Sequence, residues 1–143
     1  MSVETHSTKA SDIVRDKLIE AGGTVTIYTL QGKAFNIAIT ADHKAFETKK
    51  LPQYNYGFEV FDIIIDLIHE NGGKAIKGNG RGKNNKLGQL GCELDTIVGA
   101  IGYRYAGKTV GESVFDPVFV LGAILEWAEI CHNERGYLEL WKY

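Results

Sequence analysis

The stretch FEVFDIIIDLIHENGG, residues 58–73, has the strongest periodic pattern in this sequence. Phe58, Phe61 and Ile65 recur at intervals of three and four residues, a spacing that places their side chains along one face of an α-helix. The stretch ends in two glycines, and glycine readily adopts the left-handed backbone found just beyond many helix ends. The pattern therefore predicts a central helix over residues 58–70.

Alternating β-branched residues precede this helix. Residues 24–30 (TVTIYTL) and 34–40 (AFNIAIT) each predict a strand, and the Gln-Gly pair between them suits a tight turn. A third strand is predicted over residues 44–50, and it ends before Pro52 because proline cannot continue a hydrogen-bonded strand. The segment predicts a small antiparallel sheet.

Another helix is predicted upstream of these strands. Ser11 can cap a helix over residues 12–21, which a second glycine pair ends. Residues 12–23 (DIVRDKLIEAGG) and 62–73 (DIIIDLIHENGG) share six identities in twelve positions. Two ordinary helices with the same stop signal explain this similarity, and a duplicated helix–strand unit is the alternative. Residues 1–10 are expected to form a flexible polar tail.

The chain beyond the central helix is predicted to begin with a loop and then to turn helical. Residues 71–92 contain many glycines and asparagines and predict the loop. Asp95 can cap a helical segment that reaches Ala106 and stops at Gly107. Two further glycines inside this segment weaken its helix propensity.

The clearest helix start is Asp116-Pro117, because a carboxylate can cap the first amides and proline fits the first helical position. The helix expected from Pro117 to about Ile130 is apolar on most sides, which predicts burial. Residues 136–141 (GYLELW) predict a final strand. The order helix, two or three strands, helix, loop, helix, helix, strand predicts a single α+β domain over residues 11–143, with about four helices and a small, mostly antiparallel sheet.

The composition is that of a globular protein, with 44% hydrophobic and 24% charged residues. A net charge of -2 gives no general attraction to polyanions, so any such attraction needs a local patch. Cys92 and Cys131 are too few for a disulfide scaffold and are expected to be buried free thiols. The N-terminus lacks the features of a signal peptide and no apolar run is long enough to cross a bilayer, so a soluble cytoplasmic protein is expected.

One segment departs from this acidic balance. The sequence KAIKGNGRGKNNK, residues 74–86, contains five basic residues, and the rest of the chain has 11 Lys and Arg against 18 Asp and Glu. Its interleaved glycines free the backbone to approach an anion. We therefore predict a non-catalytic module that binds nucleic acid or another polyanion. The predicted phosphate contacts are Lys74, Lys77, Arg81, Lys83 and Lys86.

The alternative to this binding site is a solvated loop whose charges serve only solubility. If nucleic acid does bind, residues 31–33 at the predicted hairpin tip could act as the wing of a winged helix. The basic segment has too few aromatic residues around it for base stacking, which favours duplex over single-stranded nucleic acid.

Residues 102–109, GYRYAGKT, match the phosphate-binding pattern G-x-x-x-x-G-K-[ST]. Such a loop needs a helix that begins at the lysine and directs its N-terminus toward the phosphates. A glycine and a proline soon follow Lys108, so no such helix is expected. We expect the match to be accidental and Gly107 to stop a helix, with a nucleotide-binding enzyme kept as an alternative.

Glu47 and Lys49 would share one face of the third predicted strand, an arrangement that suggests a metal-dependent nuclease of the D…E-x-K type. Such a site needs a second carboxylate on the neighbouring strand. The expected register places Ala38 opposite Glu47 and Asn36 opposite the lysine, while Asp42 lies in the turn, out of reach. A solvent-facing strand is favoured, with the nuclease kept as an alternative.

The remaining motifs predict no cofactor and no metal site. The four histidines lack a ligand spacing such as H-E-x-x-H, and no serine lies in a G-x-S-x-G turn. The last alternative is an interaction module whose C-terminal strand, with Tyr137, Trp141 and Tyr143, pairs with another chain and forms a homo-oligomer.

Overall fold

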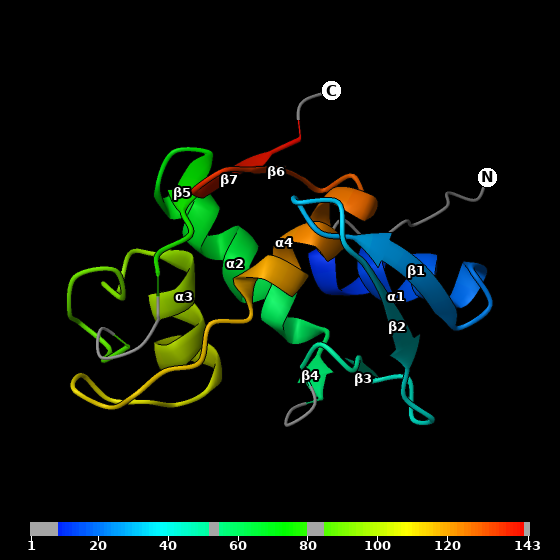
Figure 1. Cartoon of the computed structure of the whole chain (residues 1–143), viewed down its shortest axis with the longest axis horizontal. Coiled ribbons are helices and arrows are strands. Elements are labelled where there is room, and N and C mark those ends of the chain that lie inside the picture. The colour runs from blue at the N-terminus through cyan, green and yellow to red at the C-terminus, as the bar shows by residue number, and fades with distance from the viewer. Residues whose placement is uncertain (1–8, 52–54, 80–84, 142–143) are drawn as a thin grey trace, which may run out of the picture.

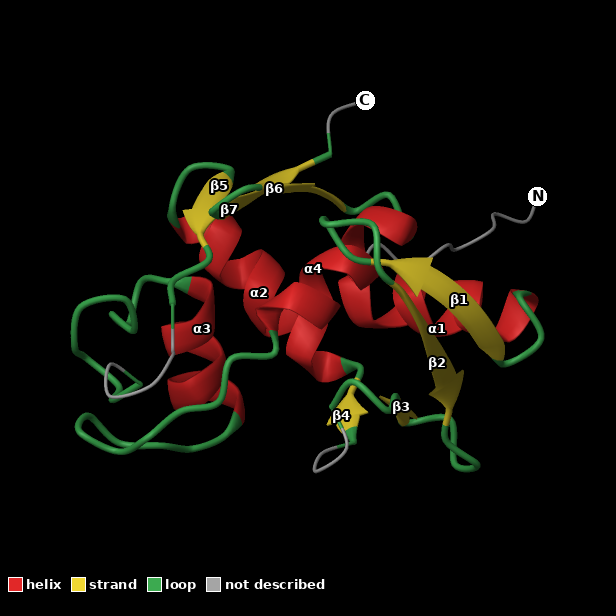
Figure 2. Cartoon of the chain, in the orientation of Figure 1, coloured by secondary structure: helices red, strands yellow, loops and turns green. Residues whose placement is uncertain are grey.

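The computed structural model describes residues 9–51, 55–79 and 85–141, and in these ranges it forms four helical segments and seven short strands (Figures 1 and 2). The helices are α1 (Ala10–Glu20), α2 (Glu59–Glu70), α3 (Ile97–Ala100) with its π-helical continuation η2 (Ile101–Tyr105), and α4 (Val118–Trp127). The strands are β1 (Thr24–Tyr28), β2 (Ala34–Ile39), β3 (Ala45–Glu47), β4 (Tyr56–Gly57), β5 (Lys74–Ile76), β6 (Cys131–Glu134) and β7 (Tyr137–Leu140). The predicted α+β class is confirmed.

The first four strands form an antiparallel sheet in the order β1-β2-β3-β4. Thr24 of β1 pairs with Ala38 of β2, and the turn between them is closed by the Gly32 amide, which donates to the Thr29 carbonyl at 2.8 Å. Gly32 has a φ of 85°, in the left-handed region that favours glycine. The predicted hairpin is therefore confirmed, while the third strand, β3, is shorter than predicted.

The last three strands form a second antiparallel sheet in the order β5-β7-β6. The prediction of one sheet, of a loop throughout residues 71–92 and of a single C-terminal strand was wrong. β5 and β6 have only three and four residues, which is too few for strand alternation to stand out in the sequence. Ala75 of β5 and Leu138 of β7 are buried, so burial against the rest of the core stabilises these short strands.

α2 runs through the middle of the molecule, where it contacts α1, α3, η2, β5 and β7 (Figure 1). Phe61 of α2 also stacks on Phe46 of the first sheet, with 5.7 Å between ring centroids. The central position predicted for this helix is confirmed. Its buried residues are Val60, Phe61, Ile64, Leu67 and Ile68.

α1 and α2 end in the same hydrogen-bonded turn. The Gly23 amide donates to the Leu18 carbonyl at 2.9 Å, and the Gly73 amide donates to the Ile68 carbonyl at 2.8 Å. The two glycines have φ values of 90° and 109°, so the predicted glycine stops are confirmed. A strand follows each turn, but β1 and β5 belong to different sheets.

Two predicted helix caps were wrong. Ser11 lies inside α1, and its amide donates to Oδ1 of Asp62 at 2.9 Å, which ties α1 to α2. At α3 the cap is Thr96 rather than Asp95, since the Thr96 hydroxyl oxygen accepts from the Gly99 amide at 3.1 Å. A polar residue before an apolar run thus located each helix start only to within a residue or two.

α4 is buried on most sides, as its composition predicts. Oδ1 of Asp116 accepts from the Val118 amide at 3.1 Å, which confirms the predicted cap. The helix ends at Trp127, earlier than predicted, because Glu129 turns the chain with a φ of 59° and no glycine marks the stop. None of the helices in the described ranges has the length and apolarity needed to cross a membrane.

Both cysteines are buried and form no disulfide, as predicted. Burial raises the pKa of the Cys131 thiol to about 12. A thiol with so high a pKa stays protonated near neutral pH, so Cys131 acts as a core residue.

Candidate nucleic-acid interface

An open cleft of about 1180 Å³ lies where several chain segments meet. Its walls come from the β1–β2 turn, the chain after β5, the segment that leads into α4, and the β6–β7 turn (Figure 1). Each wall is a turn or an element end, and such positions are fixed by the elements they join while leaving side chains exposed. The sheets and α4 thus position side chains that lie far apart in the sequence.

Basic residues outnumber acidic ones along this cleft. Three exposed basic residues line it: Lys33 in the β1–β2 turn, Lys50 in the loop after β3, and Arg135 in the β6–β7 turn. The fourth basic residue, Lys77, is half-buried. The acidic lining residues are Asp116 and Glu134.

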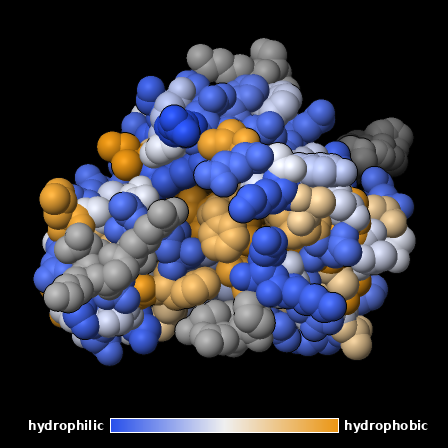
Figure 3. All heavy atoms as spheres, viewed as in Figure 1, coloured by the Kyte–Doolittle hydropathy of each residue, from blue (hydrophilic) through white to orange (hydrophobic). Residues whose placement is uncertain are grey.

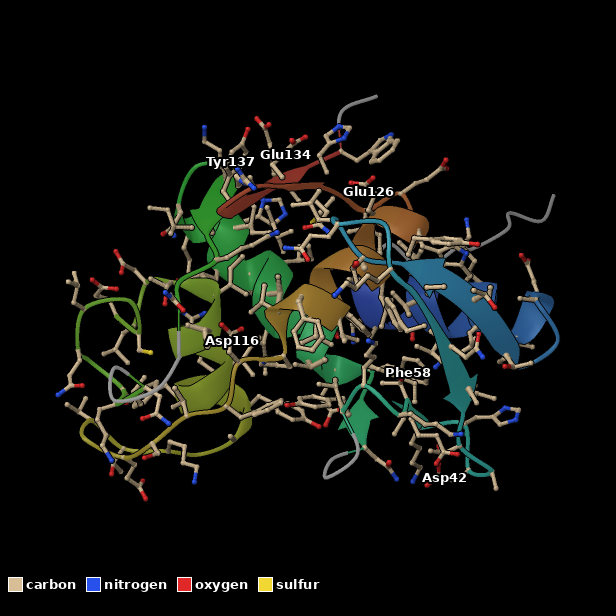
Figure 4. All side chains as sticks on the ribbon, in the orientation of Figure 1. Asp42, Phe58, Asp116, Glu126, Glu134 and Tyr137 are labelled. Carbon is tan, nitrogen blue, oxygen red and sulfur yellow. The ribbon has the colours of Figure 1, made fainter. Side chains whose placement is uncertain are left out.

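Lys77 differs from the other three cations because it is half-buried and feels the charges of three carboxylates. Burial lowers the pKa of Lys77, while the nearby charges of Asp116, Glu126 and Glu134 act in the opposite direction. Figure 4 shows Asp116 and Glu126 at opposite ends of α4, and Glu134 on the adjacent sheet. These acids offset the charge of Lys77, so it attracts phosphate less than an exposed lysine would.

The structure separates the basic residues predicted from the sequence. Lys74 lies on β5 with its Nζ 4.6 Å from the centroid of the Tyr137 ring, and Nζ of Lys86 donates to Oγ of Ser113 at 2.8 Å. Neither residue lines the cleft, whereas Lys77 does. Arg81 and Lys83 lie outside the described residues. The prediction that the basic segment, residues 74–86, lies entirely in a loop was wrong, because β5 occupies residues 74–76.

The sequence analysis does not single out Lys33, Lys50 or Arg135 as candidate anion contacts, although all three line the cleft. Of these three residues, only Lys33 lies in a segment to which the sequence assigns a binding role, namely the predicted wing at residues 31–33. The other two are isolated basic residues in turns, and only the fold brings them to the same cleft. No local pattern could have linked positions so far apart in the chain.

Two aromatic side chains also line the cleft. Phe115 and Phe119 are 43% and 47% exposed, and Leu30 from the β1–β2 turn is 51% exposed. Figure 3 shows apolar surface over α4 in the middle of this face, with hydrophilic side chains around it. The cleft therefore combines an apolar, partly aromatic surface with a basic rim.

The segment GYRYAGKT does not have the structure of a phosphate-binding loop. Its first half lies within η2, and Gly107 follows with a φ of 70°, so the predicted helix stop is confirmed. The Lys108 amide donates back to the Gly102 carbonyl at 2.9 Å, and the Thr109 hydroxyl donates to Oε1 of Glu112 at 2.9 Å. Within residues 85–141 no helix begins at Lys108, which is where a phosphate loop requires one.

The strand pair around Glu47 has the register expected from the sequence, with Ala38 opposite Glu47. β3 ends at Glu47, so the expected pairing of Lys49 with Asn36 does not form. Hydrogen bonds from the Thr40 hydroxyl and the Lys44 amide to Asp42 lower the pKa of that carboxyl. In the described part of the chain no three His, Cys, Asp or Glu side chains are grouped so that they could hold a metal ion.

The C-terminal strand is not available for pairing with another chain in the way predicted. β7 is the middle strand of its sheet, with β5 on one side and β6 on the other, so its backbone hydrogen bonds are made within the protein. Trp141, just beyond β7, stacks on His132 at 4.2 Å between ring centroids. Tyr143 lies outside the described residues.

Comparison of the chain with protein-family models, with curated proteins and with solved structures gives no match. The residues of the cleft therefore provide the basis for a functional proposal.

Proposed function

We propose that this protein is a non-catalytic module that binds nucleic acid in the cleft, with phosphates contacting Lys33, Lys50 and Arg135. The proposal rests on one observation: three exposed cations from distant parts of the sequence line the same cleft. The chain as a whole has a net charge of -2, whereas four basic and two acidic residues line the cleft, so positive charge is in local excess there.

Described residues at both ends of the stretch that holds Arg81 and Lys83 line this cleft. Asn79 and Asn85 both line it, and the two residues precede and follow the stretch that contains Arg81 and Lys83. We therefore keep Arg81 and Lys83 as predicted phosphate contacts. Lys74 and Lys86 are expected to contribute less, because neither lines the cleft.

A binding role is favoured over an enzymatic one because neither catalytic motif has its structural context. The GYRYAGKT segment lacks the helix that a phosphate loop requires, and Glu47 faces Ala38 instead of a second carboxylate. Phosphate contacts alone position a nucleic acid and supply affinity without sequence preference.

The test is a salt titration of binding to a fluorescently labelled duplex and to the corresponding single strand. Log affinity should fall linearly with log salt concentration, by about 0.9 per phosphate neutralised on duplex and about 0.7 on a single strand. Replacing both Lys33 and Lys50 by alanine should flatten the slope by about 1.8 on duplex or about 1.4 on a single strand.

Lys44→Ala is the matched control. Lys44 is also exposed, but it lies in the β2–β3 turn, at the other end of β2 from the cleft. Its loss should leave the slope nearly unchanged. The proposal is wrong if the wild type binds neither probe at low salt, or if the double variant keeps the wild-type slope.

A further inference from the structure

The exposure of Phe119 is unusual for its helix. Seven of the ten residues of α4 are buried, yet Phe119 is 47% exposed in the first turn. Large apolar side chains gain free energy by leaving water, so a half-exposed ring in a concave surface is available to cover a ligand.

Phe115 is held by a well-defined backbone on either side. The Val114 amide donates to the Asn85 carbonyl at 2.8 Å, and Asp116 caps α4 two residues before the helix proper. Pro117 restricts the chain further, since its ring fixes φ. The side chain of Phe115 remains 43% exposed while its backbone is constrained. Such a ring can contact a ligand at a small cost in conformational entropy.

Cations lie on the same cleft as these rings. Lys33 and Lys50 approach it from the first sheet and the loop after β3, and Arg135 approaches it from the β6–β7 turn. Proteins that bind single strands without strong sequence preference combine such a basic groove with aromatic side chains on which bases stack.

We infer that the cleft binds single-stranded nucleic acid, with bases stacked on Phe115 and Phe119 and phosphates on the surrounding Lys33, Lys50 and Arg135. This inference rests on the proposed function and specifies its ligand. A duplex offers the same phosphates, but its bases are already stacked on one another and their faces are closed to Phe115 and Phe119. The two rings therefore favour a single strand over a duplex. This inference replaces the preference for duplex expected from the sequence, because two aromatic residues outside the basic segment line the cleft: Phe115, just before α4, and Phe119, in its first turn.

The experiment compares three fluorescently labelled probes at one low salt concentration. The probes are an oligo(dT) of about 15 nucleotides, a length within the range that such surfaces cover, an abasic strand with the same number of phosphates, and a duplex. Stacking predicts that oligo(dT) binds about tenfold or more tightly than the abasic strand, since one stacked base changes affinity about 5- to 150-fold. An oligo(U) probe of the same length then distinguishes RNA from DNA as the preferred strand.

Variants assign that difference to the rings. The Phe115→Leu/Phe119→Leu double variant keeps apolar side chains but removes the aromatic faces, and it should bind oligo(dT) and the abasic strand almost equally. Tyr103→Leu is the matched control, because Tyr103 is 52% exposed but does not line the cleft. It should retain the wild-type ratio of the two affinities. The melting temperature of each variant shows whether the fold is retained, and the comparison of probes on the wild type needs no variant.

The possible failures are distinct. Equal binding of oligo(dT) and the abasic strand by the wild type, together with a salt-dependent affinity in the titration described above, would overturn the stacking inference and leave the proposed phosphate contacts in place. Tighter binding of the duplex than of oligo(dT) would do the same. No binding of any probe at low salt would overturn the proposed function itself.

Discussion

At the scale of single residues, two glycines in α3 and η2 are required by close packing, although glycine disfavours helix formation. Gly99 and Gly102 lower the helix propensity of this segment, yet the segment is helical. A Cβ atom on Gly99 would collide with the carbonyl oxygen of Glu93, and one on Gly102 would lie 2.6 Å from Cγ1 of Val114. The helix therefore needs glycine at both positions, because neighbouring chain segments pack against its backbone.

This close packing predicts the effect of Gly99→Ala. In an exposed helix the change would stabilise by up to about 1 kcal/mol. Here the colliding atom belongs to the backbone, so the neighbouring chain must move, and overpacking of this kind costs about 1–3 kcal/mol or more. We expect a net loss in the free energy of unfolding, measured by urea denaturation. A variant as stable as the wild type would contradict the packing of Glu93 against α3.

At the scale of elements, those with their own periodic pattern could be predicted from the sequence and the others could not. α2, α4 and the β1–β2 hairpin each contain enough residues for an apolar period or a turn signal to stand out. β5 and β6 do not, and each forms only because β7 pairs with it. β5 pairs with β7 across about 60 positions of the sequence, and a local pattern contains no trace of such a pairing, whereas β6 and β7 form a short local hairpin.

The burial of α4 predicts that the fold depends on its side chains. Ile124 and Leu125 are fully buried, so replacing either by alanine should cost about 2–5 kcal/mol in the free energy of unfolding. Ile19→Ala is the control, because Ile19 on α1 is 43% exposed and its loss should cost well under half as much. Urea denaturation of the three variants measures these differences. Small effects at both α4 positions would mean that this helix is not part of the core.

At the scale of the whole molecule, the candidate site shows what a linear reading of the sequence can and cannot find. The sequence located an excess of positive charge in residues 74–86, and of the described basic residues in this segment only Lys77 lines the cleft. Lys33, Lys50 and Arg135 are unremarkable in the sequence, because a surface patch is defined by distances in space. The same holds for Phe115 and Phe119, whose place beside these cations follows from the position of α4.

We propose that nucleic acid binds in this cleft, and not along the basic segment as a linear unit. Titrating oligo(dT) into ¹⁵N-labelled protein and following the backbone amide signals by NMR shows which residues the nucleic acid contacts. We predict that the largest changes occur at Lys33, Phe119 and Gly136, which line three different walls, and that Lys74 and Lys86 change little. Changes centred on Lys74 and Lys86, with the cleft amides unaffected, would contradict the account.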